Sequence, residues 1–132
     1  MAAIAPIPED RTVYRGLRNS NWCRLGVVHF KAFLLRPGNA LYPPEAELSL
    51  GLTAGSAVDE LTEHHGTAAL SVLAVNALPH HLQVIPDPDN AAKAQMSGLP
   101  MFSTEEAQRG LAITMASDLA AIAWHVPVPQ VN

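Results

Sequence analysis

The segment between Ser103 and Trp124 constrains the fold of this chain more than any other. Ser103 and Glu106 have the spacing of a capping box, and they predict a helix from Thr104 to about Trp124. Its polar residues keep to one narrow stripe, and residues 120–124 carry no polar side chain. The opposite face holds Leu111, Met115, Leu119 and Ile122. A helix that is apolar nearly all round is buried in a core or a subunit interface.

The rest of the chain is cut by prolines and glycines into short segments, most of which have the alternation or apolar content of strands. We expect strands at residues 11–17, 25–35, 48–52, 68–78 and 82–85. In the second of them, His29 would lie on the more polar face. Residues 36–47 contain three prolines, at positions 37, 43 and 44, and predict a loop.

Two shorter helices are also expected. Ser56 is placed to cap a helix that runs through His64 or His65 and ends at Gly66. A second short helix is expected from Asn90 to Met96, ended by Gly98.

Together these elements predict an α+β protein, with one domain built on a mixed or antiparallel sheet of four to six short strands. One short mid-chain helix and one long C-terminal helix would accompany the sheet. The 132 residues suit a single domain. We expect that domain at residues 11–126, an extended or flexible lead-in at 1–10, and an extended tail at 127–132.

The charge and composition of the chain limit the kinds of partner that we expect it to bind. A net charge of −4 argues against nucleic-acid binding, which needs clustered Lys and Arg. Charged residues make up only 15% of the chain, which suggests uncharged surface patches that a second copy would cover. We therefore expect a homodimer. Another protein or a small anionic ligand, held by the basic N-terminal quarter around Arg15 and Arg18, is the alternative partner.

The single cysteine, Cys23, excludes an internal disulfide and is expected to be a packed thiol. No apolar run approaches the roughly 20 residues that a membrane span requires. The first ten residues lack both the basic region and the long apolar region of a signal peptide. These features predict a soluble cytoplasmic protein that makes no contact with a membrane.

Two adjacent histidine pairs, at residues 64–65 and 80–81, raise the question of a metal site. Neighbouring residues on a helix point about 100° apart, so His64 and His65 cannot both face one ion. Glu60 and His64 are four residues apart and would share a helix face, so they could form half a site that His80 completes. The alternative is that these histidines only end a helix and turn a loop.

The stretch Tyr14-Arg15-Gly16 resembles the first core strand of ADP-ribosyltransferases, whose arginine anchors a phosphate of NAD. In that family a Ser-Thr-Ser-like strand follows, and Leu48-Ser49-Leu50 corresponds to it loosely. The resemblance implies an NAD site at Arg15 and Ser49, with a catalytic glutamate from a late strand. Here the late glutamates, Glu105 and Glu106, open a helix instead, which puts catalysis in doubt.

The last two-thirds of the chain resembles a group of small uncharacterised bacterial proteins. The resemblance rests on the order of a Leu-Ser-Leu strand, a capped helix, an apolar strand, and then the segments 84–88 and 96–100. In that group a histidine-containing segment follows the Asp-Pro turn, where this chain has Ala94-Gln95-Met96. The resemblance implies no activity.

We therefore expect a binding or interaction module without a catalytic centre and without a cofactor. The alternative is an enzyme, either ADP-ribosyltransferase-like, with NAD held by Arg15, Arg18 and Ser49, or metal-dependent through Glu60, His64 and His80.

Overall fold

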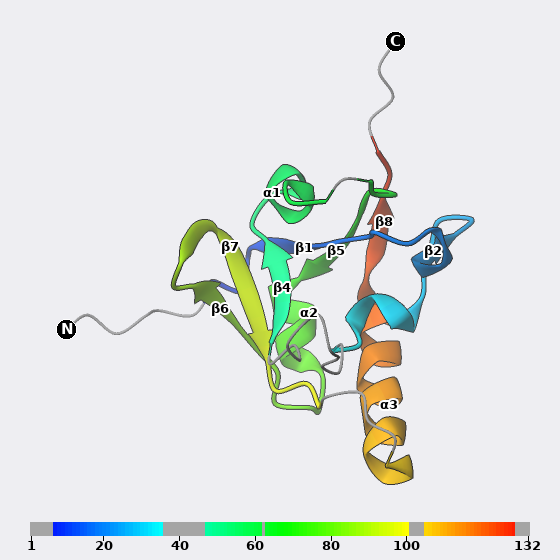
Figure 1. Ribbon diagram of the computed structural model, residues 1–132. Helices are drawn as coiled ribbons and strands as arrows, with labels where there is room; N and C mark the ends of the chain where they lie inside the picture. The colour runs from blue at the N-terminus through cyan, green and yellow to red at the C-terminus, as the bar shows by residue number, and fades with distance from the viewer. Residues whose placement is uncertain (1–6, 36–46, 62, 101–104, 129–132) are drawn as a thin grey trace, which may run out of the picture.

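A six-stranded antiparallel sheet forms the centre of the protein in the computed structural model, which describes residues 7–35, 47–61, 63–100 and 105–128 (Figure 1). The strand order is β6-β7-β4-β1-β5-β8. The bounds of these strands are Thr12–Gly16 (β1), Leu48–Gly51 (β4), Thr67–Ser71 (β5), Gln83–Asp87 (β6), Asn90–Ser97 (β7) and Trp124–Val126 (β8). A separate hairpin pairs β2 (Cys23–Arg24) with β3 (Val27–Val28).

The helices are short except for the last. They are α1 (Ala54–Val58), α2 (Val72–Ala77) and α3 (Glu106–Ile122), with 3-10 turns η1 (Ser20–Trp22) and η2 (Phe30–Phe33). The predicted α+β class, the single domain and the long C-terminal helix are therefore confirmed.

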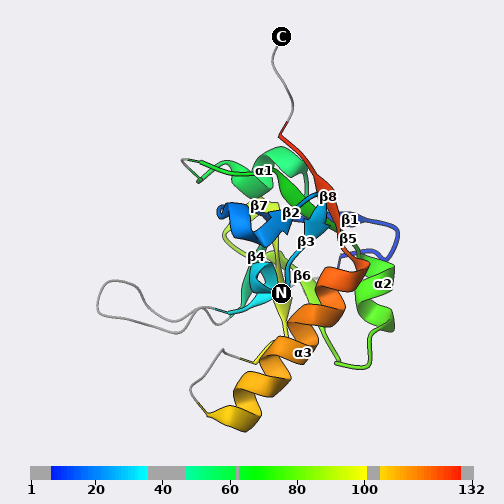
Figure 2. The same ribbon diagram turned by 90° about the vertical axis from the view of Figure 1, so that its right-hand side faces the viewer.

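The two faces of the sheet are covered differently (Figures 1 and 2). Alternate strand residues, such as Val13 on β1 and Leu70 on β5, join a core with the buried side of α3, with η2 and with α2. The other face carries α1, which lies almost on the backbone of β1 and β4. A Cβ at Gly16 would lie 2.5 Å from the carbonyl oxygen of Ala57, and one at Gly51 would lie 2.4 Å from its nitrogen. Glycine at these two positions lets α1 pack this closely.

The long helix lies inside its predicted range, but its buried stripe is turned slightly. Leu111 is 52% exposed, and the buried residues are Ala112, Met115, Ala116 and Leu119. Small alanines at the contact let the helix approach η2 and β5. Ser103, which carried the predicted capping box, lies outside the described residues.

The helix predicted from Ser56 to His64 or His65 is wrong in both its cap and its length. Thr53 is the N-cap, Ser56 forms the capping box with it from the third position, and α1 ends at Val58. The chain then runs beside β1. The His65 N–H donates to the Leu17 carbonyl, and the Leu17 N–H donates to the Gly66 carbonyl. Gly66 does have the predicted positive φ, at +93°, but not as a helix end.

The predicted strand at residues 25–35 is also wrong. Leu25 and Gly26 have φ values of +54° and +79° and form the turn of the β2–β3 hairpin. His29 then caps η2, because its Nδ1 accepts a hydrogen bond from the Lys31 N–H. The turns of η2 bury Ala32 and Phe33.

Two further segments differ from the prediction. The apolar run at residues 68–78 is strand only to Ser71, whose hydroxyl accepts from the Ala74 N–H and starts α2. The segment Asn90–Met96, predicted as a helix, is strand β7. Its partners are β6 and β4, so tertiary pairing overrides the helix preference of its alanines. Pro86 is tolerated in β6 because β6 lies at the edge of the sheet.

Among the described residues, no helix has the length and apolar character needed to cross a membrane.

Candidate functional site

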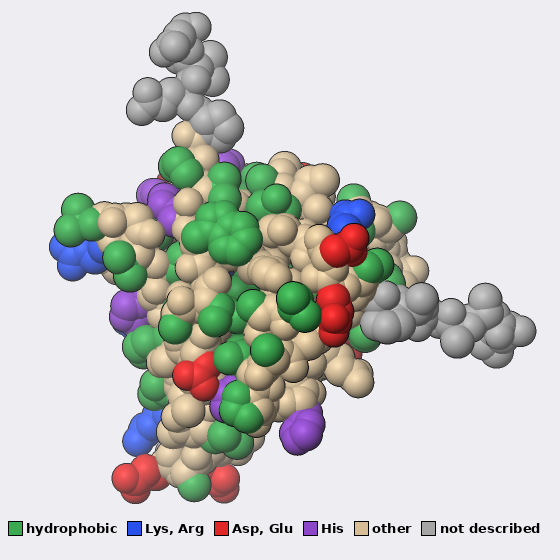
Figure 3. All heavy atoms as spheres, turned by 180° about the vertical axis from the view of Figure 1, so that it is seen from behind, with side chains coloured by type: hydrophobic (Ala, Val, Ile, Leu, Met, Phe, Trp, Pro, Cys, Tyr) green, Lys and Arg blue, Asp and Glu red, His purple; other side chains and the backbone are tan. Residues whose placement is uncertain are grey.

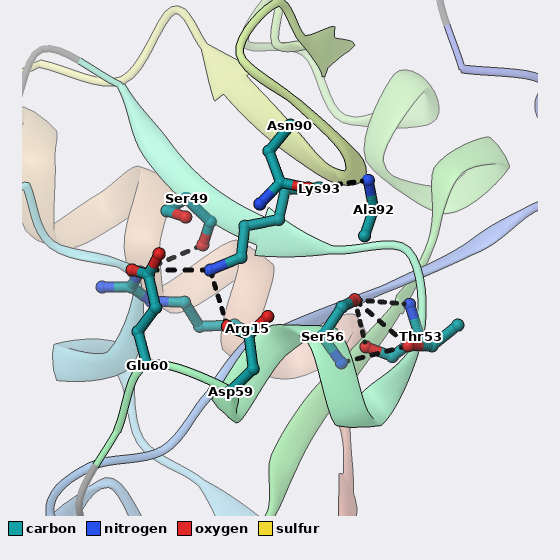
Figure 4. A network of polar contacts seen from close by, with 9 residues as sticks. All are labelled: Arg15, Ser49, Thr53, Ser56, Asp59, Glu60, Asn90, Ala92 and Lys93. Atoms are coloured by element: carbon teal, nitrogen blue, oxygen red, sulfur yellow. Dashed lines mark hydrogen bonds and ion pairs between the residues drawn. The ribbon is translucent and has the colours of Figure 1, made fainter.

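Arg15 lies on the core face of β1 and is only 8% exposed. Its Nε donates to the carbonyl of Ala32, at 2.9 Å, and its Nη1 donates to the carbonyl of Ser49, at 3.1 Å. Figure 4 shows the guanidinium reaching from β1 towards β4. Arg15 therefore ties η2 to β4.

The predicted ligand-binding set of Arg15, Arg18 and Ser49 is brought together only in part. Arg15 contacts the carbonyl of Ser49 rather than its hydroxyl. Arg18 is exposed, with its Cζ 5.5 Å from the centre of the Trp22 ring, and the Cζ of Arg15 is 5.9 Å from the same ring. The anionic ligand and the NAD site stay predictions.

Lys93 on β7 is a second buried cation, and it lies on the same face of the sheet as α1. It is 7% exposed, and its Nζ lies 3.0 Å from a carboxylate oxygen of Asp59 and 3.6 Å from one of Glu60 (Figure 4). Burial lowers the pKa of Lys93, but the hydrogen bond to Asp59 and the charge of Glu60 more than offset this, so the pKa lies above its ordinary value. The ammonium therefore stays charged, and its ion pairs with the two carboxylates are a structural contact.

The predicted metal set of Glu60, His64 and His80 is also held in other contacts. The helix on which Glu60 and His64 would share a face ends before either residue. The Nδ1 of His64 accepts from the Gly66 N–H at 3.2 Å, and the Nε2 of His80 lies 2.6 Å from a carboxylate oxygen of Asp118 on α3. Among the described residues, no group of three or more His, Cys, Asp or Glu side chains is placed to hold a metal ion.

The thiol of Cys23 is partly buried beside the carbonyl of His65, at 3.8 Å. Burial raises the pKa of this thiol above its ordinary value. Less thiolate is then present at neutral pH, so Cys23 is a weak nucleophile.

A cavity of about 250 Å³ lies between α1 and β8. On one side it is lined by Ala54, Gly55 and Val58 of α1, and on the other by residues 126–128, with His64, Gly66 and Thr67 completing the wall. Most of these groups are apolar. Its volume exceeds the roughly 150 Å³ of a dry apolar cavity known to bind benzene.

Gly66 and Thr67 determine the shape of this cavity. A Cβ at Gly66 would lie 2.1 Å from the carbonyl oxygen of Val126, so only glycine lets β8 pack here. Thr67 is 2% exposed, and its Oγ1 is buried without a hydrogen-bond partner among the described residues. An unpaired buried hydroxyl costs about 1–3 kcal/mol, so one residue of the wall carries a buried hydroxyl whose bonding capacity is unused.

A second, more open cavity of about 510 Å³ lies between α2 and the edge strand β6. Ile7 closes one side of it, and its N–H donates to the Val84 carbonyl at 3.1 Å. Its wall also includes Asn76, His81 and Gln83, and is more polar than that of the α1–β8 cavity.

Large apolar side chains are exposed at several places, including Leu73 (57%) and Trp124 (48%). Figure 3 shows hydrophobic side chains over the middle of the face seen from behind. Such surface is compatible with the expected homodimer, which stays a prediction. A measurement of molar mass by light scattering will test it.

Sequence reasoning missed both Lys93 and Thr67. Lys93 became meaningful only once β7 was recognised as a strand, because its register places Lys93 opposite Gly51, under α1. The one available signal for Thr67 was its position directly after Gly66.

Comparison of the chain with protein-family models, with curated proteins and with solved structures gives no match in any of the three. The resemblances to ADP-ribosyltransferases and to small bacterial proteins therefore stay predictions.

Proposed function

We propose that this protein is a binding module that holds a small, mainly apolar molecule between α1 and β8. The observation that carries the proposal is the cavity itself, which is lined mainly by apolar groups from three separate parts of the chain. Ligand sites are typically concave and apolar with a few polar groups that fix orientation. A volume of about 250 Å³ suits a compact molecule the size of a single ring with substituents.

The position of the charged groups supports binding over catalysis. Arg15 is bonded to two carbonyls, Lys93 to Asp59 and Glu60, and His80 to Asp118. None of these side chains lines the α1–β8 cavity. A catalytic site needs its acid, base or nucleophile in reach of the bound substrate. Of the titratable side chains, the wall of this cavity holds His64, whose Nδ1 is engaged with the Gly66 N–H.

The ADP-ribosyltransferase-like enzyme is the alternative. It needs Arg15 to reach a phosphate of NAD, which would require the guanidinium to leave the Ala32 and Ser49 carbonyls. The enzyme and the binding module therefore place their ligands on different parts of the sheet.

Amide chemical shifts of ¹⁵N-labelled protein distinguish these functions. We expect toluene to shift the amides of Val58, Gly66, Thr67 and Val126, with saturation. NAD should leave Arg15, Ser49 and their neighbours unchanged. Saturable shifts around Arg15 with NAD, and none around Val58 with toluene, would replace the binding module by the enzyme.

A pair of variants checks the location. Val58→Phe places a ring into the cavity and should abolish the toluene shifts. Leu111→Phe makes a similar change at an exposed position of α3 and should leave toluene binding as in the unmodified protein.

A further inference from the structure

We infer that the ligand of the α1–β8 cavity carries one hydrogen-bonding group, such as a hydroxyl or carbonyl, and that the Thr67 hydroxyl pairs with it. The inference rests on the proposed binding function and adds to it a chemical class and an orienting residue. It starts from Oγ1 of Thr67, which is buried, lacks a partner among the described residues, and belongs to a residue that lines the cavity.

The register of the sheet fixes where this side chain points. Thr67 lies opposite Gly16 on β1 and opposite Val126 on β8, so their side-chain positions share one face of the sheet. That face carries α1, since a Cβ at Gly16 would meet Ala57. Thr67 is therefore directed into the layer between the sheet and α1, where the cavity lies.

Rotation about the Cα–Cβ bond of threonine exchanges the hydroxyl and the methyl among three staggered positions. A ligand in the cavity can therefore be met by either group without movement of the backbone. A hydroxyl can both donate and accept, so a ligand hydroxyl or carbonyl would satisfy it. An apolar ligand would leave it unpaired.

His64 limits the chemical class of the ligand further. Its Nδ1 accepts from the Gly66 N–H, so the neutral ring carries its proton on Nε2 and can only donate from there. Among the residues that form the wall, His64 and Thr67 are the ones with polar side chains, and none carries a carboxylate. That wall favours a neutral ligand that can accept a hydrogen bond over an ammonium compound.

Phenol and toluene test the inference, because they share a shape and differ by a hydroxyl in place of a methyl. Dissociation constants of both are measured by amide shifts in the unmodified protein, in Thr67→Val and in Thr67→Ser. We expect Thr67→Val to weaken phenol relative to toluene by about tenfold, the effect of one lost hydrogen bond that leaves its partner unpaired. Thr67→Ser keeps the hydroxyl and should keep the preference within about twofold. If Thr67→Val does not fold, Thr67→Ala removes the same hydroxyl.

The possible outcomes distinguish a failure of this inference from a failure of the proposed binding function. Equal phenol-to-toluene ratios in all variants, with both probes bound at Val58 and Thr67, would overturn the role of Thr67 and leave the binding module standing. Absence of binding by both probes would overturn both. A changed ratio in Thr67→Ser as well as Thr67→Val would assign the effect to packing and overturn the hydrogen bond.

Discussion

The segment Ala54–Glu60 has two flanks that differ in how they meet the sheet. Towards β7, Asp59 and Glu60 form ion pairs with the buried ammonium of Lys93. Towards β8, Ala54, Gly55 and Val58 face a cavity. The difference has a physical cause. A buried charge needs a partner at a fixed distance, whereas apolar groups make no directional demand, so space can remain between them. The polar flank thus fixes α1, and the apolar flank borders the cavity in which we propose that a ligand binds.

The largest expected loss of stability comes from disrupting the packing on the apolar flank. Gly66→Ala puts a Cβ against the Val126 carbonyl at a residue with φ of +93°, and should cost about 3 kcal/mol or more of unfolding free energy. Urea denaturation followed by circular dichroism measures this. Gly110→Ala is the control, because nothing lies within 4 Å of its Cβ position on α3, and it should stabilise by about 0.5–1 kcal/mol. Equal effects at both positions would contradict the close packing of β8 on Gly66.

The next effect breaks the polar flank. Replacing both acids, Asp59→Asn with Glu60→Gln, leaves the Lys93 ammonium buried without an opposite charge. We expect a loss of about 2 kcal/mol at pH 7, measured by urea denaturation. The matched control, Asp89→Asn with Glu63→Gln, makes the same charge change at exposed positions and should stay within about 0.5 kcal/mol. A loss in the control as large as in the test pair would assign the effect to net charge.

A smaller effect, of opposite sign, is expected at Thr67. Thr67→Val replaces an unpaired buried hydroxyl by a methyl of the same shape, so it should stabilise the ligand-free protein by about 1 kcal/mol. The midpoint of thermal unfolding would rise by a few degrees. A drop in the midpoint would mean that the hydroxyl is satisfied in solution.

The smallest effect is on pH dependence. The pKa of Lys93 is raised in the folded protein, so its contribution to stability is complete below the ordinary lysine pKa of about 10.4. It is lost as the pH rises through the raised folded value. The unmodified protein should therefore lose stability relative to Lys93→Met only above about pH 10. A gap that opens between pH 7 and 9 instead would contradict the raised pKa.

Helices and strands whose own residues show a clear pattern could be predicted from the sequence. Strand β1 alternates along its length, and the length and apolar residues of α3 mark it as a long buried helix. Strand β7 was not predictable, because its alanines favour a helix and only pairing with β4 and β6 makes it a strand. The run at residues 68–78 is apolar throughout, which does not distinguish β5 from α2, and the switch depends on the cap at Ser71.

In the candidate site, too, single residues could be picked out from the sequence, but their partners could not. Arg15 was predicted to bind an anionic ligand, and the partners that the sequence did not indicate are carbonyls of η2 and β4, distant in the chain. The α1–β8 cavity is formed by residues 54–58, 64–67 and 126–128, and no local pattern connects these segments. What the sequence lacks at both places is the register of the sheet.

The place of α3 and β8 in the chain has a consequence for synthesis. Strand β5 has β1 on one side and β8 on the other, and α3 covers the core face. A nascent chain that has not yet passed residue 106 holds Phe33 of η2 and Leu70 of β5 without the helix that packs on those elements. Their apolar surface therefore stays open to the ribosome exit region, chaperones or other nascent chains until residues 106–126 emerge.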